Sequence, residues 1–210
     1  MTVYCFMETR QVGALLLVTE AEALTGVYYR MCPHSPEVPK AWRCDEGHPL
    51  LRQAGRQLLE YLAGKRIDFT VPLCSKGTEY QKQVWRQITG IPYGQTITYS
   101  ELAERTGAPR AIRAAAAATG KNPLSIVIPC HRVMGKGGAL TGYAGGLRRK
   151  HALLEIEQAA QVLRPALTEI RVNKATVSST KALISARAHR DDHCVSRAEI
   201  SNAKLAGDCV

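Results

Sequence analysis

The first 70 residues carry short apolar runs followed by one strongly periodic segment. The runs are separated by glycines and predict strands of a small antiparallel sheet at 3–7, 14–19 and 25–29. Apolar residues then recur at helical spacing from Pro49 to Leu62, and Gly64 stands where a helix would end. We therefore expect a sheet and one long helix, which together look like a scaffold.

Two capping boxes mark helix starts in the second part of the chain, which begins near residue 75. Thr78 is followed three residues later by Gln81, and Thr98 by Glu101. In this motif the threonine side chain accepts a backbone N–H, and the later side chain reaches back to the threonine N–H. The first of these helices then presents an apolar stripe of Tyr80, Val84, Trp85 and Ile88.

A third helix completes a helix-turn-helix candidate. The second helix should stop at Gly107, and Pro109 at a first helical position should start the next one, over 111–119. This last helix holds Arg113 followed by five alanines, so it has almost no side chains that can read base edges. Its small residues let it approach DNA closely, and Arg110 and Arg113 supply long cationic arms. The pattern suits recognition of shape and backbone more than of sequence.

Composition and charge narrow the class of protein. The 210 residues are 45% hydrophobic and 22% charged, as in an ordinary globular protein. No apolar run approaches the ~20 residues of a membrane span, and we expect no secretory signal. The seven cysteines are odd in number and lack paired spacings, which favours a reducing compartment. The formal net charge of +10 favours a polyanionic partner such as nucleic acid, although many small basic proteins have none.

The candidate chemistry lies in the segment Pro129-Cys130-His131-Arg132-Val133. A cysteine acts as a nucleophile in its thiolate form, and an adjacent histidine can help to generate that form. Neighbours on an extended chain point to opposite sides, so His131 needs a turn, or a water, to reach the sulfur of Cys130. Taken alone, such a pair would more often be a buried free cysteine beside an ordinary polar histidine.

Together with Asn122-Pro123 before it and the loop 141–146 after it, this segment resembles the active site of the O6-alkylguanine-DNA alkyltransferases. These proteins are also called methylated-DNA–protein-cysteine methyltransferases, and the resemblance is to the short bacterial type. It covers roughly residues 1 to 157 and is detailed from Thr78 onward. It implies a suicide methyltransferase that repairs O6-alkylguanine in DNA, and it leaves open whether O4-alkylthymine is repaired as well.

The resemblance also implies the catalytic roles, residue by residue. Cys130 matches the alkyl acceptor and His131 the base that deprotonates it through a water. Glu157 matches the carboxylate that orients this histidine, which is the logic of a hydrolase triad. Tyr99 matches the hydroxyl donor that stabilises the departing guanine, and Asn122 the residue that ties the recognition helix to the cysteine loop.

A DNA surface and a base pocket follow from the same resemblance. Arg113 matches the arginine that fills the space of a rotated-out nucleotide, since the alkylated oxygen lies within the base stack. The expected DNA contacts are Arg113, Ala114, Arg110, Thr98 and Lys121. The expected pocket walls are Val133, Tyr143, Ala144, Gly145 and Lys150. Because Ala144 and the two glycines after it are small, we expect a roomy loop that accepts groups larger than methyl.

The implied fold class is α+β. A small ribonuclease H-like N-terminal domain of antiparallel sheet and helix, 1–73, precedes a mainly helical, winged-helix-like helix-turn-helix domain, 74–157. The second domain carries the active cysteine and ends in a helix over 147–157. Residues 158–210 have no place in the resemblance and show no sustained periodicity, so we expect a partly or wholly disordered tail.

We expect no cofactor and no metal. Cys32 and His34 offer two possible ligands without a convincing second pair, while His189, His193 and Cys194 lie in the expected tail, where a closed site rarely forms. The expected partner is double-stranded DNA containing alkylated guanine, bound by a monomer. No membrane is expected, and the expected location is the cytoplasm, or the nucleus in a eukaryote.

Two other classes of function stay in view. A lesion-binding protein without transfer would share the helix-turn-helix, Arg113 and Tyr99, but it would have no use for an activated thiol at Cys130. A helix-turn-helix transcription regulator is disfavoured by the alanine-rich second helix.

Overall fold

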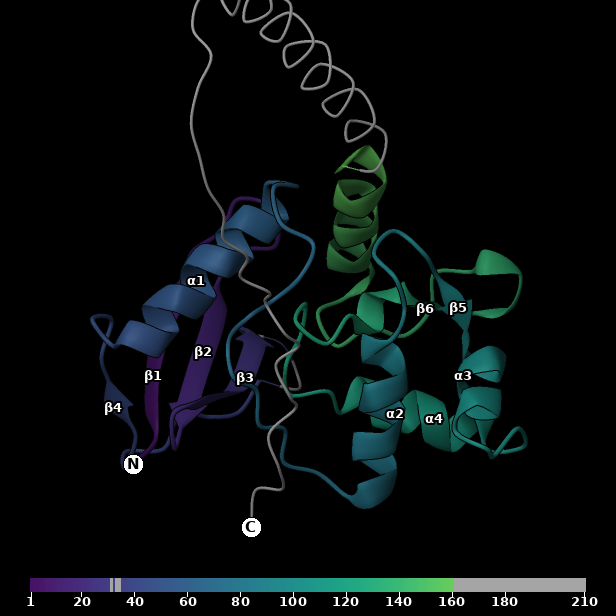
Figure 1. Cartoon of the computed structure of the whole chain (residues 1–210), viewed down its shortest axis with the longest axis horizontal. Helices are drawn as coiled ribbons and strands as arrows, with labels where there is room; N and C mark the ends of the chain where they lie inside the picture. Colours follow the sequence, from purple (N-terminus) through teal and green to yellow (C-terminus); the bar gives the residue numbers. More distant parts are fainter. Residues whose placement is uncertain (31, 33–34, 161–210) are drawn as a thin grey trace, which may run out of the picture. The chain divides into compact units, whose positions relative to one another are not determined.

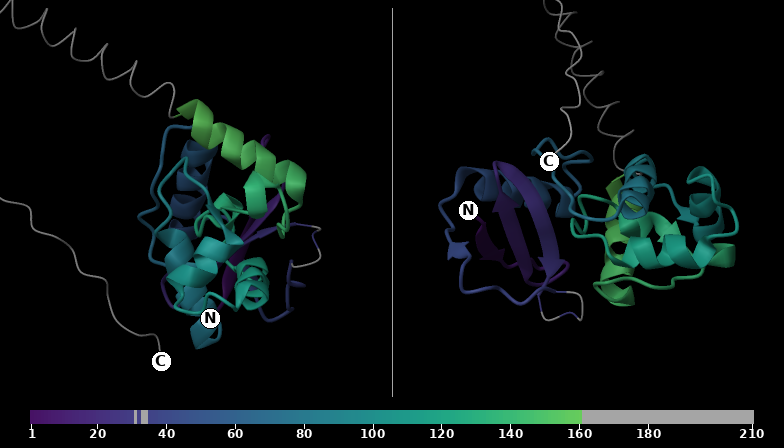
Figure 2. Two further views of the ribbon diagram at one scale, coloured as in Figure 1. Left: turned by 90° about the vertical axis from the view of Figure 1, so that its right-hand side faces the viewer. Right: turned by 90° about the horizontal axis from the view of Figure 1, so that it is seen from below.

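The computed structural model describes residues 1–30, 32 and 35–160. Figure 1 shows its elements along the chain, and Figure 2 shows them from two further sides. Within the described part, no helix is both long and apolar enough to cross a membrane.

The N-terminal sheet has the strand order β3-β2-β1-β4 (Figure 1). β1 (Val3–Met7), β2 (Leu15–Glu20) and β3 (Ala23–Tyr29) pair antiparallel, which confirms the predicted strands. β3 begins two residues earlier than predicted, because Ala21 and Glu22 alone make the turn that joins it to β2, both with positive φ. Glycine or asparagine usually supplies such a turn, so the sequence lacks the expected signal.

A fourth strand is absent from the sequence prediction. β4 (Arg43–Cys44) is two residues long and pairs parallel to β1. The sheet is therefore mixed at this edge rather than purely antiparallel. So short a strand carries no alternation of apolar and polar residues that a sequence pattern could reveal.

α1 (Pro49–Leu62) has the predicted bounds and lies across one face of the sheet (Figure 1). Its apolar stripe buries Leu51, Leu58 and Leu62 in the core that the sheet also lines. Burial of each such side chain stabilises the fold by about 1.5–3 kcal/mol. Gly64, with a φ of +69°, follows the helix end as predicted.

α2 (Glu79–Thr89) and α3 (Tyr99–Arg105) begin at the two predicted capping boxes. In each box the threonine accepts from the backbone of the residue three positions on, whose side chain accepts the threonine N–H. Two of the donors that a helix start leaves open are thereby satisfied. Gly107, with a φ of +72°, follows the end of α3 as predicted.

α4 (Ile112–Gly120) is the expected second helix of the pair, but the prediction for its start is wrong. Ala111 is the N-cap residue, and its N–H donates to Ala108 O at 2.8 Å. Pro109 therefore occupies the second position of a β-turn before the helix, a position that proline favours as strongly as a helix start. α2 holds α4 in place, because Trp85 Nε1 donates to Ala118 O at 2.9 Å.

A short parallel pairing ties the start of α3 to the cysteine segment. β5 (Ile97–Thr98) pairs with β6 (Val133–Met134), which directly follows the 3-10 turn η1 (Cys130–Arg132). A second 3-10 turn, η2 (Lys136–Gly138), comes next. The last described helix, green in Figure 1, runs throughout the described residues 147–160 and so continues past its predicted end at 157.

Residues Met1–Gln161 form one compact unit. The division of this unit into domains 1–73 and 74–157 stays a prediction. The tail predicted for 158–210 lies outside the described residues from position 161 onward.

Thr78→Ala should destabilise the fold by about 1 kcal/mol, because α2 loses the acceptor of the Gln81 N–H. Thr78→Ser keeps that acceptor and should unfold close to the wild type. Urea unfolding of the full chain measures both free energies. Equal losses in the two variants would mean that the capping box does not stabilise this helix.

Candidate active site

Cys130 and His131 both point into the protein from the turn η1. Cys130 is 3% exposed and His131 is fully buried. The Arg132 N–H donates to Pro129 O at 2.9 Å and closes the turn. The chain therefore makes the turn that Cys130 and His131, as sequence neighbours, need if both are to point into the protein.

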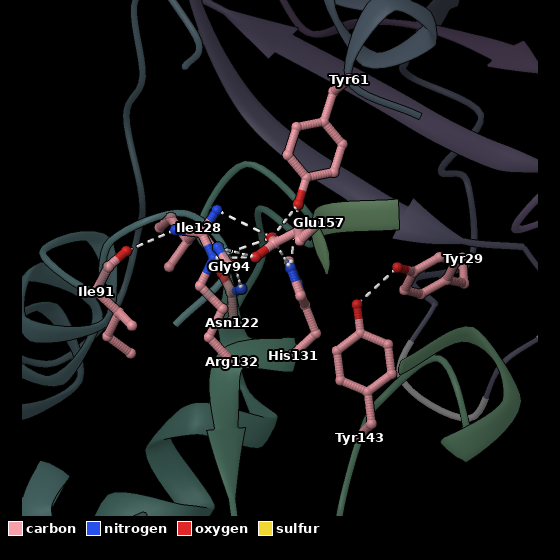
Figure 3. Close-up of polar contacts among 10 residues, drawn as sticks. All are labelled: Tyr29, Tyr61, Ile91, Gly94, Asn122, Ile128, His131, Arg132, Tyr143 and Glu157. Atoms are coloured by element: carbon pink, nitrogen blue, oxygen red, sulfur yellow. Dashed lines mark hydrogen bonds and ion pairs between the residues drawn. The ribbon is translucent and has the colours of Figure 1, made fainter. Parts of the chain in front are cut away.

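The Asn122 side chain fixes this turn from the end of α4. Its Nδ2 donates to Ile128 O at 2.8 Å and to Cys130 Sγ at 3.1 Å, and the first of these bonds is drawn in Figure 3. Its Oδ1 accepts from the Leu124 N–H at 2.9 Å, so the amide is fully engaged. Burial raises the pKa of Cys130, although the bond from Asn122 and the charge of Lys150 oppose this effect. The thiol therefore needs a base in order to ionise.

His131 is bonded on one side of its ring. Its Nε2 lies 2.7 Å from Glu157 Oε1, whereas Nδ1 has no hydrogen-bond partner among the described residues. We assign the proton to Nε2, because the carboxylate can only accept it, and this leaves the lone pair of Nδ1 free. Burial lowers the pKa of His131 despite the opposing effect of Glu157. The imidazole is therefore neutral near pH 7 and able to accept a proton.

Glu157 is a fully buried carboxylate that receives hydrogen bonds from four residues, which lie in three segments of the chain (Figure 3). Arg132 Nε lies 3.0 and 3.1 Å from its two oxygens, and the Gly94 N–H donates to Oε2 at 2.7 Å. The Tyr61 hydroxyl and His131 Nε2 both donate to Oε1. Burial alone would raise the pKa of Glu157. The bonds from His131 and Tyr61, with the charge of Arg132, outweigh burial and lower this pKa to about 2.

Two side chains of this cluster, and the Gly94 N–H, are absent from the sequence prediction. Arg132 is buried and also donates to Ile91 O at 2.6 Å; its position inside the cysteine motif was the available signal. Tyr61 comes from α1, where its spacing from Leu58 places it on the buried face. Nothing along the chain indicates which distant group it meets. The interpretation of residues 1–70 as a scaffold is therefore incomplete.

This arrangement has counterparts among known proteins. The family model described as 6-O-methylguanine DNA methyltransferase, DNA binding domain, matches residues 79–159. A methylated-DNA–protein-cysteine methyltransferase of Methanosarcina acetivorans is 44% identical over 146 residues, which cover 70% of this chain and 92% of the relative. The chain belongs to the methylated-DNA–protein-cysteine methyltransferase family.

Mycobacterial members support the same assignment. The methyltransferase of Mycobacterium bovis is 43% identical over 148 residues, covering 70% of this chain and 87% of the relative. The crystal structure of Mycobacterium tuberculosis OGT in complex with DNA is similar with a TM-score of 0.70 at 39% identity, and covers 75% of this chain and 94% of that one. The expected family and the expected α+β fold are thereby confirmed.

In this methyltransferase, the residues expected to contact DNA lie on or beside the helix-turn-helix. Arg110, Arg113, Ala114 and Lys121 are exposed. Thr98 is half-buried, and its hydroxyl is engaged as the N-cap of α3. The geometry therefore leaves four of the five side chains open to a partner.

Tyr99 is the first residue of α3 and reaches the loop that follows β6. Its hydroxyl donates to Gly142 O at 3.2 Å. Burial raises the pKa of Tyr99, and the neighbouring Cys130 acts in the same direction. The phenol therefore stays protonated and remains able to donate a hydrogen bond.

Lys150 holds the expected pocket wall together from inside. It is fully buried and donates to Val133 O at 2.6 Å and to Thr141 O at 2.8 Å. Burial lowers its pKa to about 8, although Cys130 opposes this effect. Lys150 thus joins the strand after the cysteine turn to the loop that precedes its own helix, rather than offering its amine to a pocket.

The loop after Thr141 packs closely against β3. Tyr143 and Tyr29 share a hydrogen bond of 2.6 Å between their hydroxyls (Figure 3). A Cβ at Gly145 would lie 2.5 Å from the Tyr29 ring, and Gly146 has a φ of +84°. Gly145 therefore allows close packing rather than making the loop roomy, and Gly146 makes a turn. The expectation that groups larger than methyl are accepted stays a prediction. Ala144 is half-buried and borders a small cleft that Tyr28, Asn122 and Ser125 also line.

Among the described residues, no group of three or more His, Cys, Asp or Glu side chains is placed to hold a metal. In this part of the chain, Cys5, Cys32, Cys44 and Cys130 are free thiols. His34 and the histidines and cysteine of the tail lie outside the described residues.

Acid should weaken the fold through Glu157. The folded pKa of about 2 lies below the ordinary 4.5, so the carboxylate stabilises the fold above pH 4.5, and the contribution is lost as the pH falls toward 2. This contribution is roughly 3 kcal/mol. Glu157→Gln should be less stable than the wild type at neutral pH and should change less with pH in this range.

Denaturant unfolding at a series of pH values measures this effect. Glu104→Gln, at an exposed position of α3, is the matched control and should follow the wild-type profile. A wild-type acid profile in Glu157→Gln would contradict the assignment of the buried carboxylate.

Proposed function

We propose that this protein repairs DNA by transferring an alkyl group from O6 of guanine to Cys130 Sγ, once per molecule. The observation that carries the proposal is the buried relay: a thiol bonded by Asn122, and beside it an imidazole whose Nε2 is held by Glu157 while Nδ1 stays free. A thiol and a base in one buried turn, with a carboxylate behind the base, suit nucleophilic transfer.

The first step is ionisation of the thiol. The proton of Cys130 moves to Nδ1 of His131, directly or through a water, and leaves a thiolate and an imidazolium. Glu157 stays ionised throughout, because its pKa is about 2, and it stabilises the imidazolium through Nε2.

The second step is an in-line displacement. The Cys130 thiolate forms a bond to the alkyl carbon as the bond from this carbon to O6 breaks, and the electron pair leaves with guanine. The Tyr99 hydroxyl donates to the departing base, for which it must leave Gly142 O. The product on the protein is a thioether, which does not hydrolyse readily. No described group is placed to remove it, so each molecule acts once.

Access to O6 requires the nucleotide to leave the duplex. We assign Arg113 to the vacant space in the stack and Ala114 to close approach in the minor groove, because both are exposed on α4. Arg110, Lys121 and Thr98 are assigned to the backbone. A relative of known structure is described as a complex with DNA, and the net charge of +10 suits such a partner.

The proposed base pocket lies between the cysteine turn and the loop after Thr141. Its walls are assigned to Val133, Tyr143, Ala144, Gly145 and Lys150. Lys150 acts from behind the wall, through its bonds to Val133 O and Thr141 O. The close packing of Gly145 on Tyr29 supports a fixed pocket, in which backbone groups of the loop read the base.

The remaining expectations complete the proposal. The chemistry requires no cofactor, since the thiol is the acceptor, and we infer that a monomer acts on double-stranded DNA. We propose the cytoplasm as its location, or the nucleus in a eukaryote, where thiols such as those described here stay reduced.

A duplex that carries O6-methylguanine labelled in the methyl group tests the function. The wild type should transfer one label per molecule to the peptide that contains Cys130, and Cys130→Ser should bind the duplex without taking label. Binding of the lesion by the wild type without label would favour a lesion-binding protein. Preference for one undamaged sequence would favour a transcription regulator.

Arg113→Ala should slow transfer from the duplex by about 10–100-fold, because extrusion of a nucleotide costs a few kcal/mol that the arginine no longer offsets. Transfer from the free base O6-methylguanine requires no extrusion and should be unchanged. Arg52→Ala removes the same charge at an exposed position of α1 and is the control. Equal slowing with duplex and free base would contradict the role in extrusion.

A further inference from the structure

Tyr61 reaches from α1 into the cluster around Glu157. Its hydroxyl donates to Glu157 Oε1 and lies 3.1 Å from His131 Nε2 (Figure 3). The side chain is fully buried, and its ring packs against Phe69 and Tyr93 at centroid distances of 5.4 and 5.9 Å. The hydroxyl is thus held where the carboxylate and the imidazole meet.

The protons present fix the direction of these bonds. Burial raises the pKa of Tyr61 well above its ordinary value, and the charge of Glu157 acts in the same direction, so the phenol is protonated. Glu157 is ionised and only accepts, so the Tyr61 hydrogen points to Oε1. The Tyr61 oxygen can then accept from the Nε2–H of His131. This N–H therefore faces two acceptors, Glu157 Oε1 and the Tyr61 oxygen, and together they hold the imidazole ring in the orientation that leaves Nδ1 free.

The same contacts bear on the basicity of His131. Oε1 of Glu157 accepts from His131, Tyr61 and Arg132, so its negative charge is shared among three donors. Without the Tyr61 donor, the carboxylate would bind the imidazolium form more strongly. This gain opposes the loss of the Tyr61 oxygen as an acceptor, and we expect it to be the larger effect, because the carboxylate is charged and lies 2.7 Å from Nε2, whereas the neutral phenol lies at 3.1 Å. The pKa of His131 would then rise, and less of the neutral base would be present at a given pH.

We propose that Tyr61 is a positioning residue for alkyl transfer, acting through Glu157 and Nε2 to orient His131 and to keep it a neutral base. The inference rests on the proposed function. It also means that α1, through Tyr61, contributes to the reaction of Cys130, which lies 69 positions later in the sequence.

Other groups face His131 and contribute to its titration. They come from the 147–160 helix, from the loop before it and from the turn η1 itself. In addition to Tyr61, the titratable and charged groups are Glu157, Lys150, Tyr143, Arg132 and Cys130. The test therefore changes the Tyr61 oxygen and leaves all of these in place.

Tyr61→Phe removes one oxygen and keeps the ring. We expect transfer from an O6-methylguanine duplex to slow roughly tenfold at neutral pH, the lower end of the effect of losing a residue that orients an active group. We also expect the acid limb of the rate profile to move upward by roughly one pH unit. Affinity for the duplex should not change, because Tyr61 is buried.

Tyr80→Phe is the matched control. The Tyr80 hydroxyl is also buried, but it has no hydrogen-bond partner among the described residues, so its loss should alter neither the rate nor the profile. If the Tyr61 hydroxyl only stabilises the fold by pairing with the buried Glu157, Tyr61→Phe will unfold more easily than the wild type and keep the wild-type acid limb, which would overturn the proposal. Absence of transfer by the wild type would instead refute the proposed function.

A second measurement does not depend on transfer. Nitrogen NMR of the imidazole in the full chain follows the titration of His131 in the wild type and in Tyr61→Phe. We expect the midpoint to lie at higher pH in the variant. An unchanged midpoint would overturn the inference even if the variant were slow for another reason.

Discussion

The buried charge of Glu157 is the constraint on which the rest of the site depends. Removing a carboxylate from water costs several kcal/mol unless donors replace the solvent. Here they come from α1, from the turn after α2 and from the cysteine turn, through Tyr61, Gly94, His131 and Arg132. A chain in which any of these segments failed to dock would leave the charge uncompensated. The cost of burying Glu157 therefore favours structures in which these separate elements meet at one point, against the turn that carries the thiol.

The groups around Glu157 also set the pKa of His131. Arg132 neutralises Glu157, so the carboxylate orients the imidazole without drawing a second proton onto it. Burial acts in the same direction and keeps the ring neutral. Protonation becomes favourable only when a thiolate forms nearby, because the new imidazolium then has an anion on each side. A neutral imidazole that becomes stabilised once charged suits the role proposed for His131, the acceptor of the thiol proton.

Local chemistry made much of this structure predictable. The capping boxes at Thr78 and Thr98, the apolar stripe of α1 and the cysteine motif each act within a few residues, and all appear where the pattern places them. Pro109 misled because proline suits a turn and a helix start equally well. Tyr61 could not be found, since the pattern shows that it is buried but not what it meets. The partners of a buried polar group depend on packing between segments distant in sequence.

The alanines of α4 lie on both its buried and its exposed face. Ala115 and Ala118 are buried, and their small side chains let α4 approach α2 closely. At this distance Trp85 of α2 can donate to the backbone oxygen of Ala118. Ala114 and Ala117 are exposed and leave the opposite face smooth. Two residues after the helix ends, Asn122 bonds the thiol of Cys130. The exposed face of α4 is therefore linked through Asn122 to the sulfur of Cys130, so contact of this face with DNA, as proposed, would also place the proposed nucleophile.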